Sequence, residues 1–262
     1  MKFYIVEVQA MKQRGIVWIL IFVFMISLLS CAANMEKKRA QAKATRELGE
    51  AYMRQGSYTE ALKEMLKAEQ INPNDHLIQN DLGLIYMSKF RYDLAETHFK
   101  KALKIKPDYA SARNNLGTVY LAEENWHAAI ETFKSMEGNL LYGTPHYPLS
   151  NLGLAYYNLG EYPSAEKYYL RALDIEPHFV IALRGLGRTY IAMPKIPEAV
   201  SVLERAVREA PTWPELHLDM GTAYRMAGEY TKALLAFNKV SELAPNSEVA
   251  EKAQNEIRTM QQ

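Results

Sequence analysis

The stretch Asn115-Leu116-Gly117-Thr118-Val119-Tyr120 holds a leucine–glycine pair with a tyrosine three residues after the glycine. The same spacing recurs six times, with methionine in place of leucine in the last copy, and an alanine follows each tyrosine after nine residues. The glycines are Gly49, Gly83, Gly117, Gly153, Gly187 and Gly221, the tyrosines are Tyr52, Tyr86, Tyr120, Tyr156, Tyr190 and Tyr224, and the alanines are Ala61, Ala95, Ala129, Ala165, Ala199 and Ala233. Successive glycines lie 34 residues apart, except for a step of 36 between Gly117 and Gly153. A fixed period of this length predicts a repeat architecture.

Each of these positions suits a unit of two packed helices. Glycine and alanine permit close approach of neighbouring helices, although glycine in a helix costs about 1 kcal/mol relative to alanine. The tyrosine fills the space between the helices. Proline cannot extend a helix and restricts the residue before it, so it marks the end of the second helix. Prolines close five of the six units, at Pro73, Pro107, Pro177, Pro211 and Pro245.

The pattern resembles the tetratricopeptide repeat, which implies an all-α fold. One such hairpin cannot cover its apolar face, so the resemblance implies six hairpins stacked into a right-handed superhelix. We expect the repeats at residues 42–75, 76–109, 110–143, 146–179, 180–213 and 214–247, all in one domain over 42–247. Val249, Ala253, Ile257 and Met260 then fall at helical spacing among polar residues. They predict a capping helix over residues 248–262 that covers the last repeat.

The N-terminus has the organisation of a signal peptide. Residues 16–29 contain Ser27 as their one polar residue, and Lys12 and Arg14 precede them. This run is shorter than the roughly 20 residues that span a bilayer and has the length of a signal-peptide core. The segment from Leu28 to Ala32 resembles a lipobox around Cys31, the chain's single cysteine. We predict a signal peptide over residues 1–30, lipidation at Cys31 and a polar tether over residues 31–41; the alternatives are an uncleaved anchor helix and a buried thiol.

The lipobox resemblance implies a mature lipoprotein carrying three acyl chains, palmitate among them, which gives stable membrane attachment. Ala32 follows the cysteine where inner-membrane lipoproteins typically have aspartate, so we expect a lipid anchor in the outer membrane, facing the periplasm. Both Met1 and Met11 remain candidate starts. Removal of residues 1–30 takes away three of 31 basic and one of 30 acidic residues, which leaves a net charge of −1. This charge gives no electrostatic basis for nucleic-acid binding.

The first helix of each repeat is expected to line the concave face of the array. Its positions 2, 5, 6, 9 and 12 combine apolar side chains with asparagine amides. Amides donate to and accept from an extended peptide backbone, while an apolar stripe takes its side chains. We therefore predict a protein-binding groove; the alternative is packing between helices with solvated amides. The predicted groove residues are Met53, Leu77, Asn80, Leu84, Met87, Asn114, Asn115, Thr118, Leu121, Tyr147, Asn151, Leu154 and Tyr157.

The sequence supports neither a carboxylate clamp nor a catalytic or metal site. A chaperone-type carboxylate clamp needs cations or amides where this chain has Glu50 and Asp81, so a free C-terminal carboxylate is not the expected ligand in that mode. The six histidines form no metal-ligand pair, and no phosphate loop or nucleophile elbow is present. We expect no enzyme, no cofactor, no metal and no small-molecule substrate.

The joint between the third and fourth repeats carries a more specific resemblance. The third repeat lacks its closing proline, two extra residues follow, and the segment reads Leu141-Tyr142-Gly143-Thr144-Pro145 before Asn151-Leu152-Gly153. This segment, with Asn114-Asn115-Leu116-Gly117-Thr118, resembles the type IV pilus biogenesis lipoproteins known as pilotins. The resemblance implies a pilotin that binds the pilus secretin and promotes its localisation and multimerisation. The alternatives are a general envelope scaffold for proteases or peptidoglycan hydrolases and an enzyme-associated repeat domain.

Overall fold

The computed structural model describes residues 25, 34–138 and 143–261. The lipidation site Cys31, nearly all of the predicted signal peptide and residues 139–142 of the joint therefore lie outside the described residues. Every described element is helical. Within the described residues, no helix combines the length and apolar character that crossing a membrane requires.

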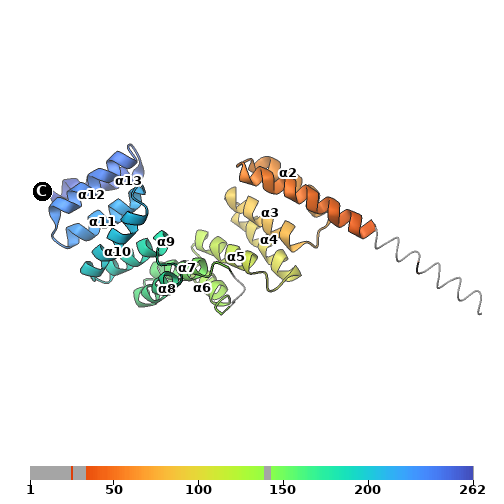
Figure 1. The fold of residues 1–262 in the computed structure, drawn as a ribbon, viewed down its shortest axis with the longest axis horizontal. Helices are drawn as coiled ribbons and strands as arrows, with labels where there is room; N and C mark the ends of the chain where they lie inside the picture. The colour runs from red at the N-terminus through yellow and green to blue at the C-terminus, as the bar shows by residue number, and fades with distance from the viewer. Residues whose placement is uncertain (1–24, 26–33, 139–142, 262) are drawn as a thin grey trace, which may run out of the picture. The chain divides into compact units, whose positions relative to one another are not determined.

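The chain forms two compact units, Met1–Pro107 and Asp108–Gln262. Figure 1 shows the helices of each unit running back and forth as successive hairpins. The first unit holds a helix over residues 34–54, α2 (Tyr58–Ile71), α3 (His76–Ser88) and α4 (Tyr92–Ile105). The second unit holds α5 (Ala110–Ala122), α6 (Trp126–Lys134), α7 (His146–Asn158), α8 (Tyr162–Ile175), α9 (Val180–Ala192), α10 (Ile196–Glu209), α11 (Pro214–Met226), α12 (Tyr230–Leu243) and α13 (Glu248–Met260). These are the six predicted hairpins and the predicted cap.

The first helix starts earlier than expected. Residues 34–41, assigned to the tether from their polarity, are helical and continuous with the first repeat. Residues 35–41 are methionine, glutamate, lysine, arginine, alanine and glutamine, all of which are strong helix formers. Ala42, at the expected boundary, is fully buried, so the helix crosses that boundary without a break.

One turn geometry closes the hairpins. The repeated tyrosine lies two residues before the end of the first helix, and its carbonyl accepts a hydrogen bond from the backbone N–H five residues later, as in Ser57 to Tyr52 (2.9 Å) and Glu229 to Tyr224 (2.9 Å). This closure needs a left-handed residue just before that N–H. Gly228 supplies it with φ +75°, whereas Phe90 holds the same position with φ +58°. Phe90 therefore carries backbone strain that glycine would avoid.

The repeated glycine has a more specific partner than helix proximity alone. A Cβ atom on Gly83 would stand 2.5 Å from Cε1 of Phe99, and one on Gly221 would stand 2.5 Å from Cε1 of Phe237. Both phenylalanines are fully buried on the second helix of the same hairpin. The missing side chain of the glycine thus leaves the space that a large side chain of the second helix fills. This packing explains why glycine occurs here despite its low helix propensity.

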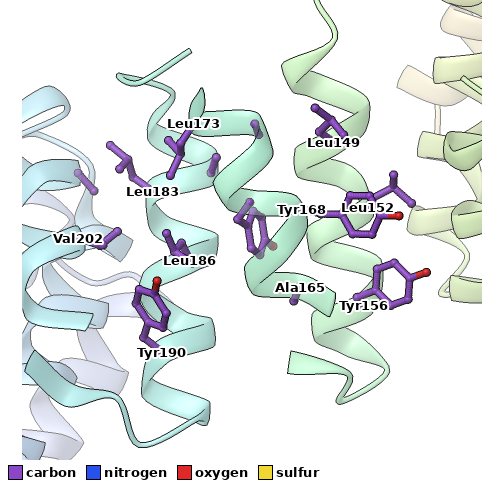
Figure 2. Close-up of a cluster of buried hydrophobic side chains, with 14 of the residues drawn as sticks. Leu149, Leu152, Tyr156, Ala165, Tyr168, Leu173, Leu183, Leu186, Tyr190 and Val202 are labelled. Carbon is purple, nitrogen blue, oxygen red and sulfur yellow. The ribbon is translucent and has the colours of Figure 1, made fainter. Parts of the chain in front are cut away.

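The core of the second unit continues from one hairpin to the next. Figure 2 shows side chains of α7, α8 and α9 meeting in one cluster, with Tyr156 and Tyr168 stacked at 5.4 Å between ring centroids. At its C-terminal end, Ala253 and Ile257 of α13 are buried, and Val249 and Met260 pack beside them. The predicted capping helix therefore covers the last repeat as expected.

Candidate protein-binding surfaces

In the first unit, the predicted groove residues lie on the helix over residues 34–54 and on α3. Met53, Leu77, Leu84 and Met87 are half-buried, so each keeps an accessible portion. Asn80 is 5% exposed, and its amide Nδ2 donates to Oδ1 of Asp81 at 3.3 Å. The apolar part of the predicted surface is accessible in this unit, whereas the amide of Asn80 lies among protein groups.

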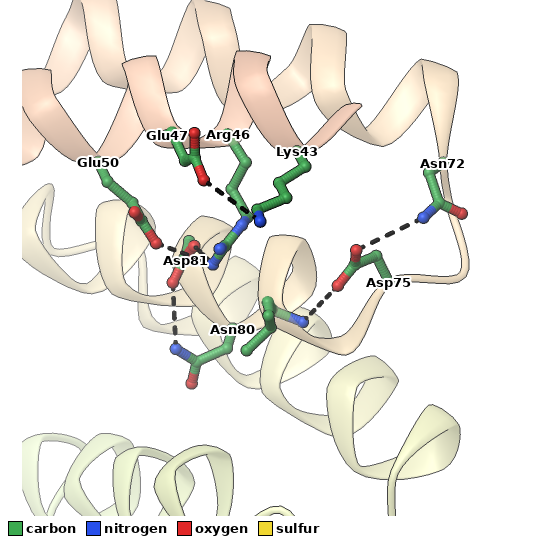
Figure 3. Close-up of polar contacts among 9 residues, drawn as sticks. Lys43, Arg46, Glu47, Glu50, Asn72, Asp75, Asn80 and Asp81 are labelled. Atoms are coloured by element: carbon green, nitrogen blue, oxygen red, sulfur yellow. Dashed lines mark hydrogen bonds and ion pairs between the residues drawn. The ribbon is translucent and has the colours of Figure 1, made fainter. Parts of the chain in front are cut away.

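An ion-pair network joins the first two hairpins. Arg46 Nη1 lies 2.8 Å from Oε1 of Glu50 and 3.3 Å from Oδ2 of Asp81, as Figure 3 shows. Burial raises the pKa of Asp81 to about 6, even though the charge of Arg46 opposes that shift. Arg46 is the cation at the position of a carboxylate clamp, and two carboxylates of the chain already pair with it. This pairing agrees with the argument made above against such a clamp.

In the second unit, Asn114, Asn115, Thr118 and Leu121 lie on α5 and are half-buried. The hydroxyl of Thr118 donates to the backbone oxygen of Asn114 at 3.0 Å, so it serves its own helix. The side-chain oxygen of Asn114 has no hydrogen-bond partner among the described residues. That oxygen is also buried, so it is not accessible to a partner segment, and Asn114 does not supply the acceptor that the groove hypothesis requires.

The remaining predicted residues lie on α7. Asn151, Leu154 and Tyr157 are half-buried, and Tyr147 is 43% exposed. One side of Tyr147 packs against Phe179, with ring centroids 5.0 Å apart. The α7 side chains thus combine an amide, an aliphatic group and two aromatic rings, each with an accessible portion.

Two arginines of α9 extend this surface; the sequence-based prediction left them out because it required asparagine amides beside apolar side chains, which coincide in the second to fourth repeats. Arg184 Nε lies 2.6 Å from Oδ2 of Asp219, the same pair of repeat positions as Arg46 and Asp81. Burial raises the pKa of Asp219, against the charge of Arg184. The guanidinium carbon of Arg188 lies 4.8 Å from the centroid of the Tyr157 ring. The spacing of 35 residues between arginine and aspartate, shared by the two pairs, is the sequence feature from which Arg184 could have been identified.

Three of the histidines, His98, His178 and His217, have partners within the protein. His98 Nδ1 lies 2.8 Å from Oε1 of Gln79, and His217 Nε2 lies 2.8 Å from the backbone oxygen of Pro211. His178 pairs with Glu209 at 2.7 Å on the surface. Over the part of the chain that the structure describes, no group of three metal-binding side chains is brought together.

Most of the chain matches known models of a repeat family. Models described as tetratricopeptide repeats match residues 74–135, 147–179 and 195–257, and one described as a TPR repeat matches residues 49–89. The chain is a tetratricopeptide repeat protein. No curated protein matches its sequence.

Solved structures resemble this tetratricopeptide repeat protein over most of its length. A crystal structure of PilW, a widely conserved type IV pilus biogenesis factor, aligns with a TM-score of 0.76 at 23% identity, covering 81% of this chain and 98% of PilW. PilF of Pseudomonas aeruginosa aligns with a TM-score of 0.73 at 18% identity, covering 83% and 99%. YrrB, a TPR protein with an unusual peptide-binding site, aligns with a TM-score of 0.55 at 20% identity, covering 73% and 97%. The predicted fold class is confirmed, and tetratricopeptide proteins generally act as interaction scaffolds.

Proposed function

We propose that this tetratricopeptide repeat protein is an outer-membrane lipoprotein that binds the type IV pilus secretin and promotes its localisation and multimerisation. Its concave repeat surface would hold a secretin subunit while a lipid on Cys31 keeps the protein at the membrane. Attachment confines the array to the zone where the secretin ring forms and so raises its effective concentration there.

The observation that best supports this proposal is the extent of the likeness to PilW and PilF. Their TM-scores are 0.76 and 0.73, and the aligned regions take in 98% and 99% of the two proteins. Tetratricopeptide folds serve many unrelated functions, so fold likeness alone identifies no partner. The lipobox at Cys31 and the pilotin-like joint near Thr144-Pro145 add support from the sequence.

Deleting the gene tests the proposal directly. Detergent-resistant secretin multimers, detected by blotting outer-membrane fractions, should be lost in the deletion strain and restored by the wild-type gene. Unchanged multimers in the outer membrane would refute the pilotin function. In that outcome, a function as a general envelope scaffold becomes the better hypothesis.

The membrane anchor has its own test in Cys31→Ser. The wild-type protein should incorporate labelled palmitate and fractionate with the outer membrane, whereas the variant should do neither because it lacks the acylated sulfur. Equal labelling of the two proteins would contradict lipidation at this residue. This measurement does not depend on the identity of the partner.

The groove is tested with Asn115→Ala and Leu84→Glu, each assayed for secretin binding in a purified system. Loss of an amide or burial of a charge in the groove should weaken binding. Leu235→Glu is the matched control, because Leu235 is 67% exposed on α12, the second helix of its hairpin. If both groove variants bind as the wild type does, the groove hypothesis is wrong.

A further inference from the structure

A small cavity opens beside α7, α9 and the start of α11, and two predicted groove residues of the fourth repeat, Asn151 and Leu154, are part of its lining. It has a volume of about 140 Å³; its polar lining residues are Ser150, Asn151, Tyr169, Arg184 and Arg188, and its large apolar ones are Leu154, Ile181 and Trp213. Pockets for small organic ligands usually measure roughly 300–1,000 Å³. This volume corresponds to about five water molecules, at roughly 30 Å³ each, and so accommodates a single side chain.

Two departures from the repeat pattern create this cavity. The first departure is Tyr169, the side chain that packs on the repeated glycine of the fourth hairpin. The other hairpins have Met65, Phe99, Phe133, Leu203 and Phe237 at this position. Where the other repeats carry an acid or an amide at the sixth position of the first helix (Glu47, Asp81, Asn115, Asn151 and Asp219), the fifth has Gly185. A Cβ atom on Gly185 would stand 2.6 Å from the Tyr169 hydroxyl. Only a glycine therefore leaves room for that hydroxyl to line the cavity.

Three polar groups of the cavity, those of Tyr169, Arg184 and Arg188, are hydrogen-bond donors, while Ser150 and Asn151 can both donate and accept. Tyr169 is 2% exposed, and its hydroxyl has no hydrogen-bond partner among the described residues. Burial raises the pKa of Tyr169, against the charge of Arg188, so the hydroxyl keeps its proton at neutral pH. Arg188 contacts the Tyr157 ring but forms no ion pair within the described part of the chain. Arg184 engages Asp219 through Nε, which leaves its terminal nitrogens for another acceptor.

The charge and the walls of the cavity define what fits. Asp219 pairs with Arg184, and Glu215 acts on Asp219 from the same helix, so Arg188 is the cation of the cavity that forms no ion pair within the described residues. A carboxylate of a partner segment would pair with Arg188. Guanidinium groups bind carboxylates through paired, charge-assisted hydrogen bonds. Ile181 is 50% exposed beside the cavity, and the Trp213 ring stacks near Arg184 at 5.4 Å. These groups suit an apolar side chain next to the acid.

We propose that this cavity binds a glutamate or aspartate side chain, flanked by apolar residues, in an extended segment of the partner protein. The proposal rests on the proposed function, because it takes the occupant to be a segment of a protein bound at the concave surface. Arg188 and Tyr169 would donate to the carboxylate, Arg184 would complete the positive field, and Ile181 and Trp213 would contact the flanking side chains.

The test uses the full chain and random short peptides displayed on phage, selected in parallel on the wild type and on Arg188→Gln. Peptides selected on the wild type should be enriched in an acidic residue beside apolar residues, and Arg188→Gln should lose that enrichment. Arg205→Gln is the matched control, since Arg205 is exposed on α10 and donates only to the backbone oxygen of Pro177. It should select the same peptides as the wild type.

The strongest selected peptide is then synthesised with an amidated C-terminus and titrated by tryptophan fluorescence. Replacing its acid by the corresponding amide should weaken binding to the wild type by roughly tenfold or more, and binding to Arg188→Gln by much less. Tyr169→Phe, which removes one oxygen without emptying the core, should reduce the same preference. Circular dichroism of each variant shows that the array is folded.

Several results would overturn the proposal: no peptide enriched, no acidic preference, the same preference on Arg188→Gln, or binding that requires a free peptide C-terminus. These results are separable from a failure of the pilotin function. Loss of the acidic preference would leave secretin multimers to be explained by another surface, whereas unchanged multimers in the deletion strain would leave the peptide preference intact.

Discussion

Replacing Gly221 by alanine puts a methyl group against a buried ring. The new Cβ would stand 2.5 Å from Cε1, 2.7 Å from Cδ1 and 3.0 Å from Cζ of Phe237. Ordinary contact begins at 3.4 Å, so the closest pair must separate by about 0.9 Å. Phe237 is fully buried, so its ring has no solvent-facing space to move into.

Two opposing effects set the size of the change. Overpacking a filled core costs about 1–3 kcal/mol, while alanine gains about 1 kcal/mol over glycine from helix propensity. We therefore expect Gly221→Ala to lower the free energy of unfolding by about 1 kcal/mol. For a protein of this size, about 1 kcal/mol shifts Tm by roughly 2–4 °C.

The measurement is thermal unfolding by circular dichroism or calorimetry, made also in a Phe237→Val background. Valine lacks the three ring atoms that the new methyl group would meet, so in that background Gly221→Ala should be neutral or stabilising. The sign reversal is the decisive result. If Gly221→Ala raises Tm in the wild type, or acts equally in both backgrounds, the reasoning that the glycine seats the ring is wrong.

Two further predictions concern the first unit. Because the pKa of Asp81 is raised to about 6, its ionised form is penalised in the folded state. Asp81→Asn should therefore raise Tm near neutral pH, and the gain should disappear as the pH falls through about 6 toward 4; a gain constant with pH would contradict it. Phe90 has φ +58° and is 78% exposed, so Phe90→Gly should raise stability by about 1 kcal/mol by relieving left-handed strain, measured by urea unfolding. Lower stability would mean that Phe90 makes contacts that outweigh the strain.

The repeat pattern predicted the hairpins because each of its positions has one dominant physical role. The period located the glycines and tyrosines, and Val249 to Met260 located the cap. The start of the first helix was missed because the prediction relied on apolar periodicity, which residues 34–41 lack. Their helix reflects intrinsic propensity and continuity with the buried Ala42.

The candidate surface was predictable only in part. Leu84, Leu154 and Tyr157 keep accessible portions, which binding at the predicted groove requires, and whether they bind a partner stays a prediction. Repeat positions could not predict that Asn80 is buried beside Asp81. Nor could they predict that the hydroxyl of Tyr169 passes Gly185, because that contact depends on tertiary packing between two hairpins.

The ion pairs between hairpins have a consequence for how this protein folds. Arg46 to Asp81 and Arg184 to Asp219 each join residues 35 apart, about one repeat. Contacts of such short sequence separation close quickly, because little chain entropy is lost before the first favourable contact forms. A hairpin can therefore fold against its neighbour without waiting for a distant part of the chain. Insertion or loss of a whole hairpin should leave the remaining interfaces able to form, which makes the length of such an array easy to change in evolution.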